Sequence, residues 1–187
     1  LYEAQFGSAS ARIMLDADQI ARFGDWDQLT APVGSPTWGV LQIDGVRGLV
    51  ASGAGTDLSL LGSRNVSLIL DGNAQLAAGW DLGNPSTLVT VEGSGYLLDI
   101  SLAAMPRSIT VATGSSVLMT ATQYNAIDAG TGEIAGAGLV TLKGMSGATL
   151  NAADLNNTGG VHFKFAVGDT NAVIDQFDTA GSGMSLG

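Results

Sequence analysis

The sequence predicts an all-β fold, and specifically a parallel β-helix (β-solenoid) with short helical turns. Its apolar segments are about three to six residues long and are separated by Gly, as is typical of strands. Four of them share one phrase, an alternating apolar segment that ends in Gly: 40–45, 68–72, 88–93 and 139–144. The glycines that end the first, third and fourth copies are roughly 50 residues apart, with half-units of roughly 20 to 30, the length of one β-helix turn.

An antiparallel β-sandwich or jelly roll is the alternative fold. The pairs Asp44-Gly45 and Asp71-Gly72 follow apolar segments, and such pairs also form tight hairpin turns. The repeat length favours the parallel arrangement over this alternative, because hairpins need no long crossover between paired strands.

The composition agrees with stacked β-structure in one domain. Hydrophobic residues make up 45% of the 187 residues, only 6% are aromatic, and 27 are Gly. Small and branched apolar side chains suit closely stacked strands with frequent turns. We expect residues 1–187 to form a single elongated domain. Because the chain begins at Leu1 rather than Met, we expect it to be a fragment or processed part of a larger exported chain.

The charge balance limits the class of partner. Seven basic residues face 17 acidic ones, which gives a net charge of −10, and cysteine is absent. Such a surface repels a phosphate backbone, so we expect no nucleic-acid partner, and it attracts cations such as Ca²⁺. No apolar run reaches the roughly 18 residues of a membrane-spanning helix, so we expect no membrane insertion.

A second phrase recurs and predicts the short helical turns. It reads apolar, polar, Ala, any residue, Gln or Asp, apolar, and its copies are 15–20, 119–124 and 150–155. In the first copy, Asp16 or Asp18 is placed to cap a helical turn. A small residue that recurs where the chain turns indicates tight packing, so we expect the shared Ala to be buried: Ala17, Ala121 and Ala152.

The three tryptophans lie in or beside two Pro-containing loops, 25–38 and 80–86. Loops that project from one side of a solenoid would bring Trp26, Trp38 and Trp80 together as a patch for a sugar or another partner. Alternatively, these side chains cover the apolar edge of a turn of the solenoid.

The C-terminal part carries a resemblance to a known family. An aromatic pair, a Gly-Asp turn and an Ile-x-x-Phe-Asp ending follow one another in residues 161–180: Phe163, Phe165, Gly168, Asp169, Ile174, Phe177 and Asp178. This stretch resembles the segment that closes the calcium-binding blocks of RTX proteins. The Gly-rich nonapeptides that bind Ca²⁺ in that family are absent from residues 1–160.

The resemblance implies a closing segment over 161–187 and secretion from a bacterium. Oxygen-bearing side chains crowd this stretch, and they form the candidate calcium site: Asp169, Asn171, Asp175 and Asp178. The upstream repeats resemble those of bacterial surface-layer proteins and adhesins, which implies an extracellular, cell-surface location.

Residues for catalysis are sparse. His162 is the only histidine, and it alternates with Phe163 and Phe165 in a strand-like segment, so we expect it to be exposed and structural. Paired carboxylates of the kind that hydrolyse glycosides are present as Asp16 with Asp18, Asp25 with Asp27 and Asp169 with Asp175. The basic residues are spread out, so we expect no enzyme.

These observations predict a structural building block of an extracellular bacterial assembly, such as a surface layer, an adhesin stalk or a filament. Its partners would be copies of itself or neighbouring domains of the same chain, because solenoid ends expose strand edges. Two alternatives are a carbohydrate-binding module that uses the tryptophan loops and a β-helical polysaccharide-degrading enzyme.

Overall fold

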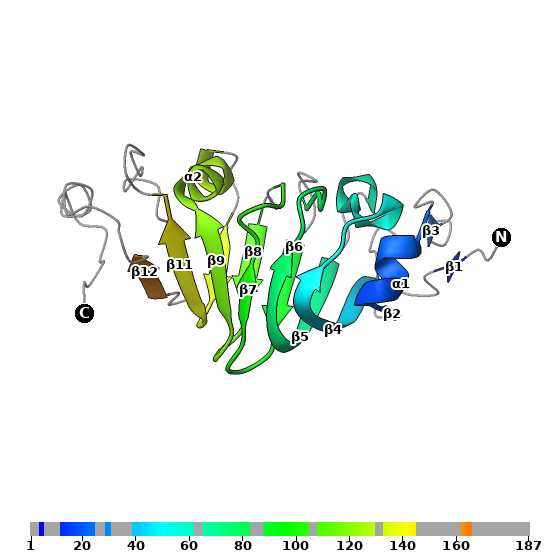
Figure 1. Ribbon diagram of the computed structural model, residues 1–187, viewed down its shortest axis with the longest axis horizontal. Helices are drawn as coiled ribbons and strands as arrows, with labels where there is room; N and C mark the ends of the chain where they lie inside the picture. The colour runs from blue at the N-terminus through cyan, green and yellow to red at the C-terminus, as the bar shows by residue number, and fades with distance from the viewer. Residues whose placement is uncertain are drawn as a thin grey trace.

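The computed structural model describes residues 4–5, 12–24, 29–30, 39–61, 65–82, 88–104, 108–129, 133–144 and 162–165. The fold is mostly β with few helices, and its main feature is a curled, half-barrel sheet of ten strands (Figure 1). A separate pair is formed by β1 (Ala4–Gln5) and β3 (Leu29–Thr30). Every pairing between the described strands is parallel, so the antiparallel alternative is wrong for this part of the chain.

One part of the sheet, here called the first ladder, starts near the N-terminus. Its members pair in chain order: β2 (Arg12–Asp16), the first half of β4 (Val40–Val50), the first half of β5 (Asn65–Leu76), β6 (Leu88–Glu92), β8 (Ser108–Val111) and β10 (Ile134–Gly136).

The other part, the second ladder, alternates with the first along the chain. It contains the second halves of β4 and β5, then β7 (Leu97–Asp99), β9 (Ser116–Thr120), β11 (Leu139–Lys143) and β12 (His162–Phe165). Because β4 and β5 belong to both ladders, they join the two parts into one curled sheet. Residues paired in either ladder lie 19 to 28 positions apart in the chain.

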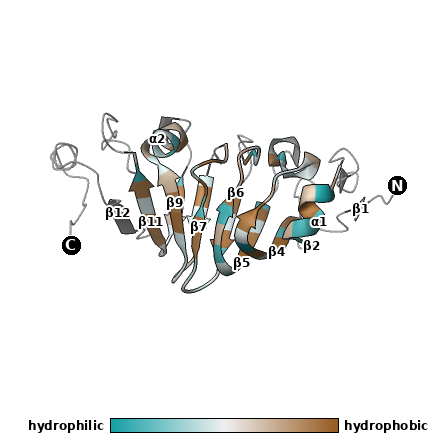
Figure 2. Ribbon diagram, in the orientation of Figure 1, coloured by the Kyte–Doolittle hydropathy of each residue, from teal (hydrophilic) through white to brown (hydrophobic). Residues whose placement is uncertain are grey.

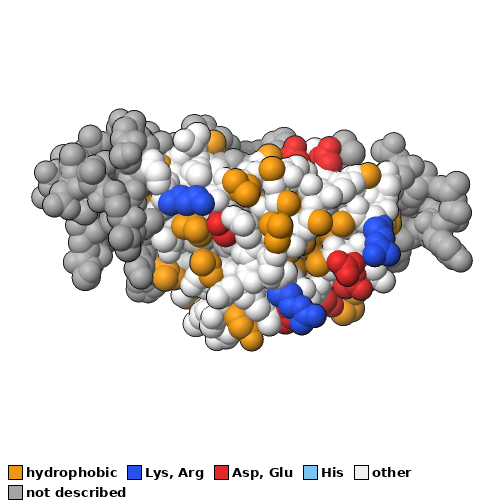
Figure 3. Space-filling model, in the orientation of Figure 1, with side chains coloured by type: hydrophobic (Ala, Val, Ile, Leu, Met, Phe, Trp, Pro, Cys, Tyr) orange, Lys and Arg blue, Asp and Glu red, His pale blue; other side chains and the backbone are white. Residues whose placement is uncertain are grey.

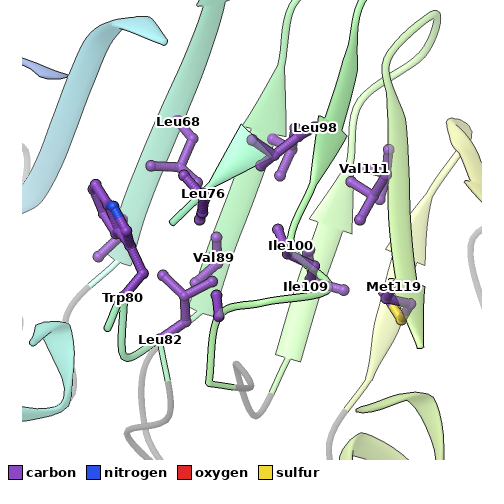
Figure 4. Close-up of a cluster of buried hydrophobic side chains, with 14 of the residues drawn as sticks. Leu68, Leu76, Trp80, Leu82, Val89, Leu98, Ile100, Ile109, Val111 and Met119 are labelled. Atoms are coloured by element: carbon purple, nitrogen blue, oxygen red, sulfur yellow. The ribbon is translucent and has the colours of Figure 1, made fainter. Parts of the chain in front are cut away.

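The core lies on the inner side of the curl and contains inward residues of both ladders (Figures 2 and 4). In the first ladder, one column of aligned, buried side chains consists of Leu41, Val66, Val89, Ile109 and Ile134. In the second ladder the equivalent column consists of Ala74, Leu98, Val117 and Val140. Burying each larger side chain is worth about 1.5–3 kcal/mol, so these columns stabilise the stack of strands.

Glycine occupies the bends between the ladders because the chain passes close to its neighbour there. Gly136 has a φ of +99°, and a Cβ at this position would lie 2.1 Å from the carbonyl oxygen of Val111. Gly93 has a φ of +135°, and its Cβ would lie 2.5 Å from that of Leu70. The repeated phrase predicts a strand that ends at Gly, and β6 and β11 do end directly before Gly93 and Gly144. Strands β4 and β5 instead continue through Gly45 and Gly72, where the chain bends from the first ladder to the second.

Two α-helices begin directly after a strand, at the second repeated phrase. Helix α1 (Ala17–Arg22) follows β2, and its N-cap Asp16 accepts a hydrogen bond from the Gln19 amide while the Gln19 side chain accepts one from the Asp16 amide. Helix α2 (Ala121–Ala129) follows β9, and Thr120 and Gln123 exchange the same two bonds. The phrase is therefore a capping box, and of the two predicted caps Asp16 is the one observed.

The repeated Ala is buried at Ala121, which is 1% exposed, and half-buried at Ala17. The third copy, with Ala152, lies outside the described residues. Helix α2 is held against the preceding turn by the buried amide of Gln123, which donates to the carbonyl oxygens of Ile100 and Ala103 at 2.8 Å each.

A third set of contacts lies beyond the second ladder, near two short 3₁₀ helices, η2 (Ala54–Thr56) and η3 (Leu58–Leu61). Single parallel bridges link Asp57 to Asp81 and Asp81 to Ala104. Backbone bonds support them, from the Asp81 amide to the Thr56 carbonyl (3.0 Å) and from the Ala104 amide to the Trp80 carbonyl (2.8 Å). The segments at Asp57, Asp81 and Ala104 therefore lie side by side.

One predicted connector is partly a strand. Residues 129–138 are nearly all Gly, Ala and Thr, which predicts a linker, yet β10 pairs with β8 in this stretch. Ala135 and Gly136 of this strand are poor strand formers, although Ile134 is a good one. Strand β10 nevertheless joins the sheet, because Ile134 aligns with Ile109 in the core column and Gly136 allows close approach to Val111.

We predict that Ala121→Leu lowers stability by about 1–3 kcal/mol, because the larger side chain overpacks the start of α2. Chemical denaturation measures the change. The matched control is Thr122→Leu at the next, exposed position of the same helix, which should change stability by less than about 0.5 kcal/mol. Equal midpoints for the two variants would contradict the tight packing at Ala121.

Candidate functional site

Most of the residues predicted to bind ligands lie outside the described part of the chain. This holds for the whole candidate calcium site, Asp169, Asn171, Asp175 and Asp178, and for Trp26 and Trp38. His162 lies in β12, as predicted, where it is paired with Leu139 of β11. These site predictions therefore stay predictions.

Trp80 is a correction, because it is a core residue and does not face a ligand. It is 1% exposed, and its indole Nε1 donates to the carbonyl oxygens of Val50 (3.3 Å) and Ala51 (3.2 Å). Figure 4 shows its ring within the buried cluster, near Leu76 and Leu82. Asp81 forms parallel bridges, so the side chains before and after it point to the opposite side. Trp80 and Leu82 are accordingly buried, whereas Asp81 is half-buried. Trp80 is therefore not part of the predicted patch for a sugar or another partner.

Carboxylates in the described residues serve local structure. Asp16 caps α1, Asp57 accepts from the amide and hydroxyl of Ser59, and Glu92 accepts from the Ser67 hydroxyl at 2.8 Å. The Asp44 carboxylate accepts from the Gln42 amide at 2.8 Å. Within the described ranges, no three His, Asp or Glu residues come together in a group able to hold a metal ion.

Asp99, on the second ladder, has several polar partners. It accepts from Gln75 Nε2 at 3.0 Å and from the backbone amide of Ser101 at 2.8 Å, and Lys143 Nζ lies 3.7 Å away. The bonds link β5, β7 and β11. The carboxylate is mostly buried, at 16% exposure, so its role is to hold neighbouring strands together.

Helix α1 packs against β4 beyond the end of β2. Strand β2 ends at Asp16 opposite Asp44, so α1 begins where β4 continues into the second ladder. The helix packs against β4 and η2 and buries Ile20 completely (Figure 1).

Nothing in this geometry assigns a reaction. Within the described residues, no helix has both the length and the apolar character needed to cross a membrane. Comparison of the chain with protein-family models, with curated proteins and with solved structures found no match. The candidate functional features are therefore the strand edges and the outer surfaces of the sheet.

We predict that Gly55→Ala weakens the contact between α1 and the sheet. A Cβ at this buried position would lie 2.3 Å from the carbonyl oxygen of Ile20 and 2.5 Å from that of Phe23, so the helix backbone must shift. The expected loss is on the order of 1–3 kcal/mol in denaturant unfolding. Gly24→Ala is the control, because its Cβ would meet no atom within 4 Å. If both variants unfold at the same denaturant concentration, the close contact is absent in solution.

Proposed function

We propose that the chain is a parallel β-solenoid that serves as a structural building block of an extracellular bacterial assembly. In this proposal each turn of the solenoid contributes one strand to the first ladder, one to the second ladder and one segment to the third side. The assembly grows by contacts between copies of the chain or with neighbouring domains, in a surface layer, an adhesin stalk or a filament.

The proposal of a solenoid rests on the regular spacing, along the chain, between residues that pair in neighbouring strands. Partners 19 to 28 residues apart recur along both ladders, and the bridges through Asp57, Asp81 and Ala104 repeat with a similar step. A spacing of about 20 to 30 residues is one turn of a β-helix. In such a stack each turn contacts only its neighbours, so the architecture is extended and suits a spacer or scaffold.

The roles of the polar residues favour a scaffold over an enzyme. Asp16, Asp99 and Glu92 are engaged in capping or cross-strand bonds. Paired catalytic carboxylates must instead face a substrate across a gap of several ångströms. A carbohydrate-binding module remains the second candidate on the strength of Trp26 and Trp38 alone, and a glycan pull-down with Trp38→Ala as its control tests it.

We propose that the C-terminal segment binds Ca²⁺, because its side chains offer a cluster of oxygen ligands. Three carboxylates and one amide fall within ten residues, at Asp169, Asn171, Asp175 and Asp178. Oxygen ligands of this kind suit Ca²⁺, and extracellular modules bind it with dissociation constants of about 10⁻⁴–10⁻³ M. The RTX-like phrase and the net charge of −10 both support this location outside the cell.

We predict that the purified chain self-associates as its concentration rises, because the turns at the ends of a solenoid expose strand edges. Sedimentation velocity over a concentration series should show growing species, and electron microscopy should show fibres or lattices. The series is run with and without Ca²⁺. A chain that stays monomeric throughout in both conditions contradicts the proposed function.

We predict that excess Ca²⁺ raises the thermal midpoint relative to EDTA, since a ligand that binds only the folded state stabilises it by mass action. Asp175→Asn should reduce the difference between the two midpoints. Asp18→Asn, on the exposed first turn of α1, is the control and should leave that difference unchanged. Coinciding midpoints for the unaltered chain would show that the C-terminal segment binds no calcium.

A further inference from the structure

We draw no further inference here: the strongest candidate, the apolar side chains scattered over the surface of the curled sheet (Figure 3), supports no proposal, because nothing in the described part of the chain shows what covers Met14 and Leu49, the two most exposed of the large ones.

Discussion

In-register stacking of parallel strands is the constraint on which the rest of this structure depends. Leu41, Val66, Val89 and Ile109 align on successive strands, so each inward side chain covers the one before it. The chain must then return to the same position after every 19 to 28 residues. This requirement fixes where bends fall, and it explains glycine at the bend near Gly136, where a Cβ would lie 2.1 Å from the Val111 carbonyl oxygen.

The helices are consequences of the same stacking. Helix α1 begins opposite the bend of β4 and packs against β4 and η2. Helix α2 satisfies two carbonyl groups of the preceding turn through Gln123, whose buried amide would otherwise cost free energy. Both helices begin with the same capping box, so one short sequence phrase ends a strand and starts a helix in two different ladders.

Several polar side chains in the described residues join neighbouring strands. Asp99 bonds to Gln75 and lies near Lys143, and Ser67 donates to Glu92. The carboxylates of Asp99 and Glu92 are thus engaged in contacts between strands, which favours a scaffold in the proposed assembly.

The sequence by itself determined the all-β class, the strand at His162–Phe165, the cap at Asp16 and the burial of Ala121, because alternation, glycine placement and capping are local properties. The candidate calcium residues and two tryptophans stay predictions from sequence. Only the tertiary structure decided that Trp80 is buried, that residues 134–136 form a strand and that α1 packs against β4. The physical reason is long-range register: a residue's neighbours here are some 20 positions away, and local patterns do not specify which of them it meets.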